Sequence, residues 1–259
     1  MRAIHEETEG NPFFVSEIVN LLAAEGELSD PAGLGEWTVT IPQGVREVVG
    51  RRLDRLSDEC NRVLAIASVL GREFSVEVLE RVSELPRDRT MELLEEAEGE
   101  RIVDSSRQGP LRYSFSHALV REALYEELGV TQRVRLHRRT AEVIEEICGD
   151  EREPHLEELA HHFLEAQELD RAIEYSEAAA NRSVEVMAFE EGADLYAKAL
   201  QALELRNPTP TKRHVELMVA LGMAQSRATS TRSSRSSTSS RPGRLATSSS
   251  RTRCRRSGS

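Results

Sequence analysis

The stretch RYSFSHALVREALYEEL, residues 112–128, changes its periodicity part-way along and guides the interpretation of the whole chain. Tyr113 and Phe115 alternate with serines, which is typical of a half-buried strand. The apolar residues that follow have helical spacing and form one stripe: Leu119, Val120, Ala123, Leu124 and Leu128. We therefore predict a strand that runs directly into a helix, with Ser116 capping the first turn and His117 at the junction.

The segment before this stretch has the spacing of four helices followed by two strands. Pro42 suits a first helical turn, Ser57 an N-cap and Gly71 a helix stop. The predicted helices occupy residues 42–56, 57–71, 75–82 and 86–98, and a β-hairpin follows at 101–115. This order is typical of a winged-helix domain with a helical preface, which we assign to residues 41–150.

Paired helices are predicted after a further helix at residues 131–148. One pattern, Leu159-Ala160 with Phe163, recurs as Gly192-Ala193 with Tyr196 at a spacing of 33 residues. A period of about 34 with small residues at contact points is typical of tetratricopeptide-type repeats. We therefore expect a mainly α fold, in which the winged-helix domain and its one small β-hairpin are followed by a tetratricopeptide-like α-solenoid at 151–225.

The end of the chain has a different composition. From Ser226 onward there is no Asp, Glu or Lys, but there are nine arginines among many serines and threonines. Subtracting these nine positive charges from the net charge of −11 leaves −20 on residues 1–225. We predict a disordered tail at 226–259. It is either an Arg/Ser-type arm that binds nucleic acid nonspecifically or the product of a frameshift, and we favour the frameshift because a repeat helix breaks off there.

Composition also bounds the class of protein. Apolar residues make up 39% of the chain and aromatic residues only 4%, so the cores must consist mainly of aliphatic side chains. No apolar run approaches the length of about 18 residues that a membrane span needs, and no secretory leader is recognisable. We therefore expect a cytoplasmic protein with no membrane partner. Cys60, Cys148 and Cys254 form no CxxC pair, which favours reduced thiols.

No catalytic constellation is recognisable in the sequence. The phosphate-binding pattern GxxxxGK[ST] is missing, so the chain alone is expected neither to hydrolyse ATP nor to hold a cofactor. His161 and His162, with Glu158 and Glu165 nearby, suggest a metal site. Without an HExxH pattern or a supported third ligand, we interpret them as part of a solvated helix face and predict no metal.

A basic cluster stands out in the helix at 131–148. Its members are Arg133, Arg135, His137, Arg138 and Arg139. We interpret the cluster as an exposed face paired with nearby glutamates, because an acidic body repels a phosphate backbone. The expected partners are Glu126, Glu127, Glu142 and Glu145.

Four blocks of sequence resemble, in the same order, the bacterial STAND-class regulatory ATPases. They are TEGNPFFVSEIVNLL (8–22), IPQGVREVVGRRLDRL (41–56), LAIASVLGREF (64–74) and the stretch at 112–128. In that family an AAA-like ATPase domain precedes a winged helix and repeats, in LuxR-type regulators and in multidomain adenylate cyclases and kinases. The resemblance covers roughly residues 5–225. It implies a C-terminal fragment without the P-loop domain, in which residues 1–40 are the remnant of the ATPase lid and its linker.

The resemblance also implies residues that sense a nucleotide. Gly10, Asn11 and Pro12 resemble the GxP motif of the family's lid, and His117 is placed like a winged-helix histidine that reports on the nucleotide phosphates in some relatives. A histidine at a helix start can donate a hydrogen bond to a phosphate oxygen. These residues would meet ATP or ADP only with the upstream domain. The plainer alternatives are a helix-start turn for Pro12 and a capping or core role for His117.

Two functions are compatible with these observations. The first is a non-catalytic regulatory segment, in which the winged helix senses the state of an upstream ATPase domain and the repeats bind a protein partner or an effector. The second is a stand-alone winged-helix regulator that binds nucleic acid through the basic cluster and the tail. Acidic residues on the helix at 86–98 oppose the second function: Glu92, Glu95, Glu96 and Glu98.

Overall fold

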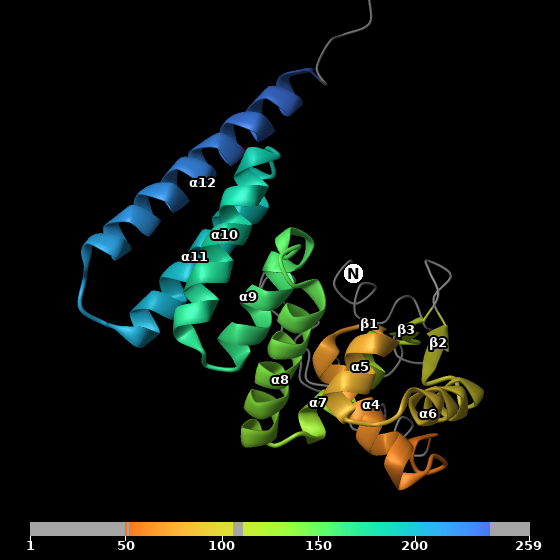
Figure 1. Ribbon diagram of the computed structural model, residues 1–259. Coiled ribbons are helices and arrows are strands. Elements are labelled where there is room, and N and C mark those ends of the chain that lie inside the picture. The colour runs from red at the N-terminus through yellow and green to blue at the C-terminus, as the bar shows by residue number, and fades with distance from the viewer. Residues whose placement is uncertain (1–49, 51, 106–110, 239–259) are drawn as a thin grey trace, which may run out of the picture.

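A computed structural model of the chain describes residues 50, 52–105 and 111–238 (Figure 1). This part is mainly helical and contains one small three-stranded antiparallel sheet. The elements are α4 (Asp58–Leu70), β1 (Glu73–Ser75), α5 (Val76–Ser83), α6 (Arg87–Gly99), β2 (Val103–Ser105), β3 (Arg112–Phe115), α7 (Ala118–Glu127), α8 (Val130–Cys148), the 3₁₀ turn η2 (Glu153–His155), α9 (Leu156–Glu165), α10 (Leu169–Glu185), α11 (Phe189–Arg206) and α12 (Lys212–Thr238). Gly10, Asn11, Pro12, the segment 1–40 and the segment 239–259 lie outside the described residues.

The helix α4 begins and ends where the sequence predicts. Ser57 is its N-cap, and the Ser57 hydroxyl accepts a hydrogen bond from the backbone N–H of Cys60 at 3.2 Å. Two acidic residues follow in the first turn, where the helix dipole is positive. The helix ends at Gly71, whose φ of 131° is a conformation that only glycine adopts readily.

The sheet has one strand more than the predicted hairpin. Its order is β1-β3-β2, and β3 pairs antiparallel with both neighbours, with Phe74 opposite Tyr113 and Val103 opposite Phe115. The prediction missed β1 because a strand of three residues with a single buried side chain, Phe74, has no readable alternation. The ring of Phe74 lies 5.5 Å from that of Phe115, centroid to centroid, so the aromatic side chains of β1 and β3 pack on one face.

The predicted change from strand to helix is confirmed, but Ser116 does not cap the helix. His117 is the N-cap of α7, in an extended conformation and without a side-chain capping bond. The Ser116 hydroxyl instead donates to the carbonyl oxygens of Arg101 and Ile102, at 2.8 and 3.1 Å. The backbone N–H of Ser116 also donates to Ile102 at 3.0 Å, so Ser116 extends the ladder between β3 and the segment before β2.

The helix α8 contributes side chains to both hydrophobic cores of the described structure. The first core unites α4, α5, α6, α7 and the sheet, and Val143 of α8 joins it. The second core unites α9 to α12 with Ala141 and Ile144 of α8. Successive residues step about 100° round a helix, so these side chains point in different directions. Figure 1 shows α8 standing between the sheet-bearing half and the helices α9 to α12.

The helices α9 to α12 each pack against the next one in the sequence, as the predicted pairing requires. The repeated positions are buried in both occurrences: Leu159, Ala160, Phe163, Gly192, Ala193 and Tyr196. The last helix differs from the prediction. α12 continues through Ser226 to Thr238, beyond the expected start of the disordered tail. The segment 226–238 contains no glycine or proline, so nothing in it stops a helix that has already begun at Lys212.

None of the described helices combines the length and the apolar composition needed to cross a membrane. α12 is the longest of them, and its C-terminal half is rich in serine, threonine and arginine.

Gly192 is a position at which two helices approach closely. A Cβ atom there would lie 2.8 Å from Cγ2 of Val184 and 3.3 Å from the carbonyl oxygen of Ala180. Val184 is β-branched and the other neighbour is backbone, so neither can move aside easily. Gly192→Ala should therefore lower the free energy of unfolding by about 1–3 kcal/mol in urea titrations.

Gly222 in α12 provides the matched control, because a Cβ atom there meets no heavy atom within 4 Å. Gly222→Ala should raise the free energy of unfolding by up to about 1 kcal/mol through helix propensity alone. Equal effects of the two substitutions would show that α10 and α11 do not pack as closely as the structure places them.

Candidate functional site

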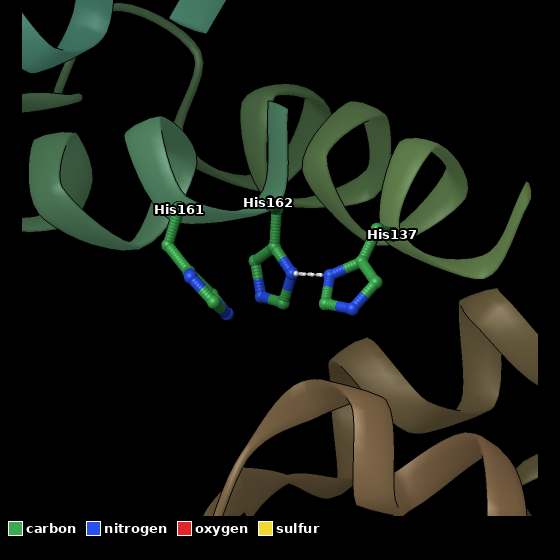
Figure 2. A group of neighbouring side chains, drawn as sticks. All are labelled: His137, His161 and His162. Carbon is green, nitrogen blue, oxygen red and sulfur yellow. Dashed lines mark hydrogen bonds between the residues drawn. The ribbon is translucent and has the colours of Figure 1, made fainter. Parts of the chain in front are cut away.

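Three histidine rings meet where α8 packs against α9 (Figure 2). His137 comes from α8, and His161 and His162 come from α9. One ring nitrogen from each residue lies within 4.8 Å of the others. The ring centroids are 5.1 Å apart for His137 and His162, and 5.3 Å apart for His161 and His162. Figure 2 shows the rings projecting into the same space on one side of the two helices.

Helical spacing explains how these side chains come together. The buried face of α8 carries His137, Thr140, Ala141 and Ile144. The last three follow His137 by three, four and seven residues, a spacing that places all four on one side of a helix. On α9 the buried residues are Leu159, Ala160, His162 and Phe163. Both His137 and His162 are only 1% exposed. His161 is the next residue on α9 and lies at the edge of the contact, where its side chain reaches solvent.

A chain of hydrogen bonds runs through the buried pair. Nδ1 of His137 lies 2.9 Å from Nδ1 of His162, and Nε2 of His137 lies 3.0 Å from the hydroxyl of Tyr125. Between two neutral imidazoles one Nδ1 must donate and the other must accept. Either the Tyr125 hydroxyl donates to His137 and His137 donates to His162, or His162 donates to His137 and His137 donates to Tyr125. Both arrangements give each of these four atoms a hydrogen-bond partner.

Burial keeps the imidazoles of His137 and His162 neutral. Desolvation lowers the pKa of His137 to about 3, and it lowers the pKa of His162 well below its usual value. The pKa of His161 is also lowered, mainly by desolvation, although the negative charge of Glu165 acts in the opposite direction. The cations that face the cluster add to the lowering: Arg121 from α7, Arg133 from α8 and Lys198 from α11. At neutral pH the rings therefore have lone pairs available.

Two arginines lie against the ring of Tyr125. The guanidinium of Arg133 lies 4.5 Å from the centre of the Tyr125 ring, and that of Arg121 lies 5.5 Å from it. Arg121 also donates to the carbonyl oxygen of Ser68 at 2.9 Å, and Arg133 to that of Leu128 at 2.9 Å. The tyrosine hydroxyl is thus a fixed partner for His137, and α4, α7 and α8 all help to orient it.

Two of these histidines do not lie where the sequence predicts. His137 was expected on an exposed basic face, whereas the structure buries it. His162 was expected on a solvated helix face with Glu158 and Glu165, but it is buried, Glu158 lies 2.9 Å from Nδ1 of His155, and the third imidazole comes from α8. The burial of His137 could have been predicted from its spacing to Ala141 and Ile144, because this spacing places His137 on the apolar stripe of α8.

Two other basic residues of α8 lie beside acidic groups, but not beside the predicted partners. Arg138 pairs with Glu168 at 2.5 Å, and Arg139 lies 4.0 Å from Glu146. Arg133 instead donates to the backbone carbonyl oxygens of Leu128 and Glu126. Glu145, an expected partner, is paired with Arg171 on α10 at 2.6 Å.

The predicted nucleotide sensor His117 and Tyr125, the hydrogen-bond partner of His137, lie at opposite ends of one helix. His117 is the half-buried N-cap of α7, and Tyr125 lies near the C-terminus of the same helix. Eight residues of helix span about 12 Å. α7 therefore connects the end of the sheet to the contact between α8 and α9.

Neither protein-family models nor curated proteins give a match to this chain.

The buried imidazoles should make folding sensitive to acid. Each has a lower pKa in the folded than in the unfolded chain, so the unfolded chain binds more protons as the pH falls below about 6.5. Stability is then complete above that pH and is lost progressively on acidification. Between pH 7 and pH 5 the free energy of unfolding should fall by about 2 kcal/mol for each fully buried ring.

Urea titrations at several pH values, with a chelator present, measure this effect. His137→Gln removes one titrating ring and should flatten the pH dependence. An identical pH slope for the wild type and His137→Gln would contradict burial of a neutral His137.

Proposed function

We propose that this chain is a non-catalytic regulatory and interaction segment of a STAND-type signal-transduction ATPase. The parent protein would be a cytoplasmic transcriptional regulator or a cyclase-associated regulator. In this proposal the segment up to residue 150, which contains the sheet and the helices α4 to α8, is a winged-helix-like clamp that responds to ATP or ADP in an upstream ATPase domain. The helices α9 to α12 are tetratricopeptide-like and bind a protein partner or an effector.

The observation that carries this proposal is an uncovered apolar stripe on α12. Its members have more than half of their surface exposed: Val215 (58%), Met218 (59%), Val219 (51%) and Met223 (59%). They lie at helical spacing along one face. The opposite face of α12 packs on the preceding helices through His214, Leu217 and Ala224, all of which are buried. α12 therefore has two apolar sides, of which the described structure covers one.

The occupant that best fits the stripe is an amphipathic helix of a protein partner. α11 packs on α10, and α12 packs on α11, so each helix of the series covers the exposed apolar side of the one before it. A further helix would continue the same packing on α12. The stripe is long and narrow, which suits a helix better than a small effector molecule.

The clamp role is supported by the position of α7. By the resemblance, His117 at its N-terminus would face the nucleotide, and Tyr125 near its C-terminus is hydrogen-bonded to His137 of α8. A displacement of α7 would therefore reach the helices that carry the proposed binding surface. ATP turnover by the purified chain would contradict the non-catalytic part of the proposal.

Site-specific photo-cross-linking in cells tests the binding surface. A photoreactive amino acid in place of Val219 should cross-link to the apolar face of a helix in another protein, and the same group in place of the exposed Glu204 on α11 should not. Met218→Glu should reduce the cross-link at position 219, because a buried carboxylate is costly in such a contact. Equal yields at the two positions, or cross-links only to disordered peptides, would exclude the proposed surface.

A second function, nucleic-acid binding, is favoured by a basic groove between α4, α5 and α8. The groove has a volume of about 690 Å³, and its lining combines apolar side chains, such as Ile66 and Leu136, with four arginines: Arg62, Arg135, Arg138 and Arg139. Acidic side chains also line it, among them Glu84 and Glu142. The mixture of charges weakens its attraction for a phosphate backbone.

DNA-binding titrations at several salt concentrations distinguish the two functions. If the regulatory proposal holds, any affinity should disappear when residues 239–259 are removed, and Arg62→Gln with Arg135→Gln should change nothing. If the groove reads nucleic acid, the truncated chain should still bind. The double substitution should then reduce the slope of log K against log salt by about 2, one unit for each lost phosphate contact.

A further inference from the structure

We propose that His137, His161 and His162 bind one divalent transition-metal ion, with zinc as the first candidate, and that the ion fastens α9 to α8. Imidazole nitrogen is a preferred ligand of zinc, and three histidines with one open position form a known type of zinc site. The three residues supply one nitrogen each from two neighbouring helices.

The distance between the two buried donors is close to what a tetrahedral ion requires. Two nitrogens bound to zinc at about 2.05 Å, with a tetrahedral angle between them, lie about 3.3 Å apart. Nδ1 of His137 and Nδ1 of His162 are 2.9 Å apart. The two nitrogens therefore need to separate by only about 0.4 Å to reach this spacing, and the proton between them would have to move away so that both lone pairs can bind the ion.

His161 can complete the set because its position permits movement. Its donor nitrogen lies within 4.8 Å of the other two, so it must approach by at most about 1.5 Å to reach tetrahedral spacing. An exposed side chain makes such a shift by rotating about its own bonds, without disturbing the packing of α9. The exposed edge of His161 also provides the route by which an ion and a water ligand would enter.

The surroundings of His137 are those of a metal-binding histidine. Such a ring generally donates its second N–H to an oxygen, which fixes both its tautomer and its orientation. Nε2 of His137 lies 3.0 Å from the Tyr125 hydroxyl, and the flanking arginines hold that tyrosine in place. With Nε2–H donating to Tyr125, the lone pair on Nδ1 of His137 points toward His162.

Tag-free full-length protein, stripped with a chelator and titrated with Zn²⁺ by calorimetry, tests the proposal. One ion should bind per chain and should raise the melting temperature. Co²⁺ should give the intense visible absorption of a four-coordinate site, and Zn²⁺ should abolish it by displacement. Weak absorption of the kind that six-coordinate Co²⁺ gives would overturn the proposed geometry.

Substitutions locate the site and separate it from surface chelation. His161→Ala removes an exposed ligand with little risk to folding and should weaken binding by a factor of at least about 10, and Tyr125→Phe should weaken it roughly tenfold. His155→Ala, at the partly exposed contact between His155 and Glu158, should leave the affinity unchanged. Failure to bind Zn²⁺, or binding that His155→Ala removes and His161→Ala does not, would overturn the proposal.

Discussion

The arrangement of the described chain depends on one helix that is buried on more than one side. Val143 of α8 completes the core of the sheet-bearing half, while Ala141 and Ile144 complete the core of the helices that follow. Such a helix cannot rotate about its axis without uncovering apolar surface in one core or the other, and each fully exposed aliphatic side chain would cost about 1.5–3 kcal/mol. The two halves are therefore joined by packing as well as by the backbone, and a displacement of one half has a physical path to the other.

Much of this architecture could be predicted from residue spacing. The alternation at Tyr113 and Phe115, the cap at Ser57 and the stop at Gly71 are local signals, and the structure confirms all three. Local signals were insufficient where the outcome depends on a distant partner. β1 exists because Glu73, Phe74 and Ser75 pair with β3, and Ser116 points away from α7 because the carbonyl oxygens of Arg101 and Ile102 lie beside it. Neither partner can be identified from the spacing of nearby residues.

The candidate site was harder to predict for a related reason. His137 lies among four arginines in the sequence, and this composition is typical of a charged, exposed surface. On the helix, however, His137 lies one turn before Ala141, and Arg135, Arg138 and Arg139 lie at other angles round the helix axis. The burial of His162 was concealed in the same way by its glutamate neighbours. The sequence alone showed that His161 and His162 are neighbours on one helix. It did not show that they meet His137, which lies on α8, 25 residues before His162.

A buried pair of imidazoles also explains why α9 occupies one definite position on α8. Aliphatic side chains at positions 137 and 162 could pack in several registers at similar cost, because dispersion forces have little direction. A 2.9 Å bond between two nitrogens does not tolerate such freedom, since a slide of one residue along the helix, about 1.5 Å, would leave both polar atoms unpaired in an apolar interior. Leaving the two buried nitrogens unpaired would cost more free energy than their hydrogen bond contributes to stability. The main effect of the bond is therefore to exclude other registers of α9 on α8. The same fixed geometry makes the cluster suited to bind an ion, because two ring nitrogens are already held close to the spacing that a tetrahedral ion requires.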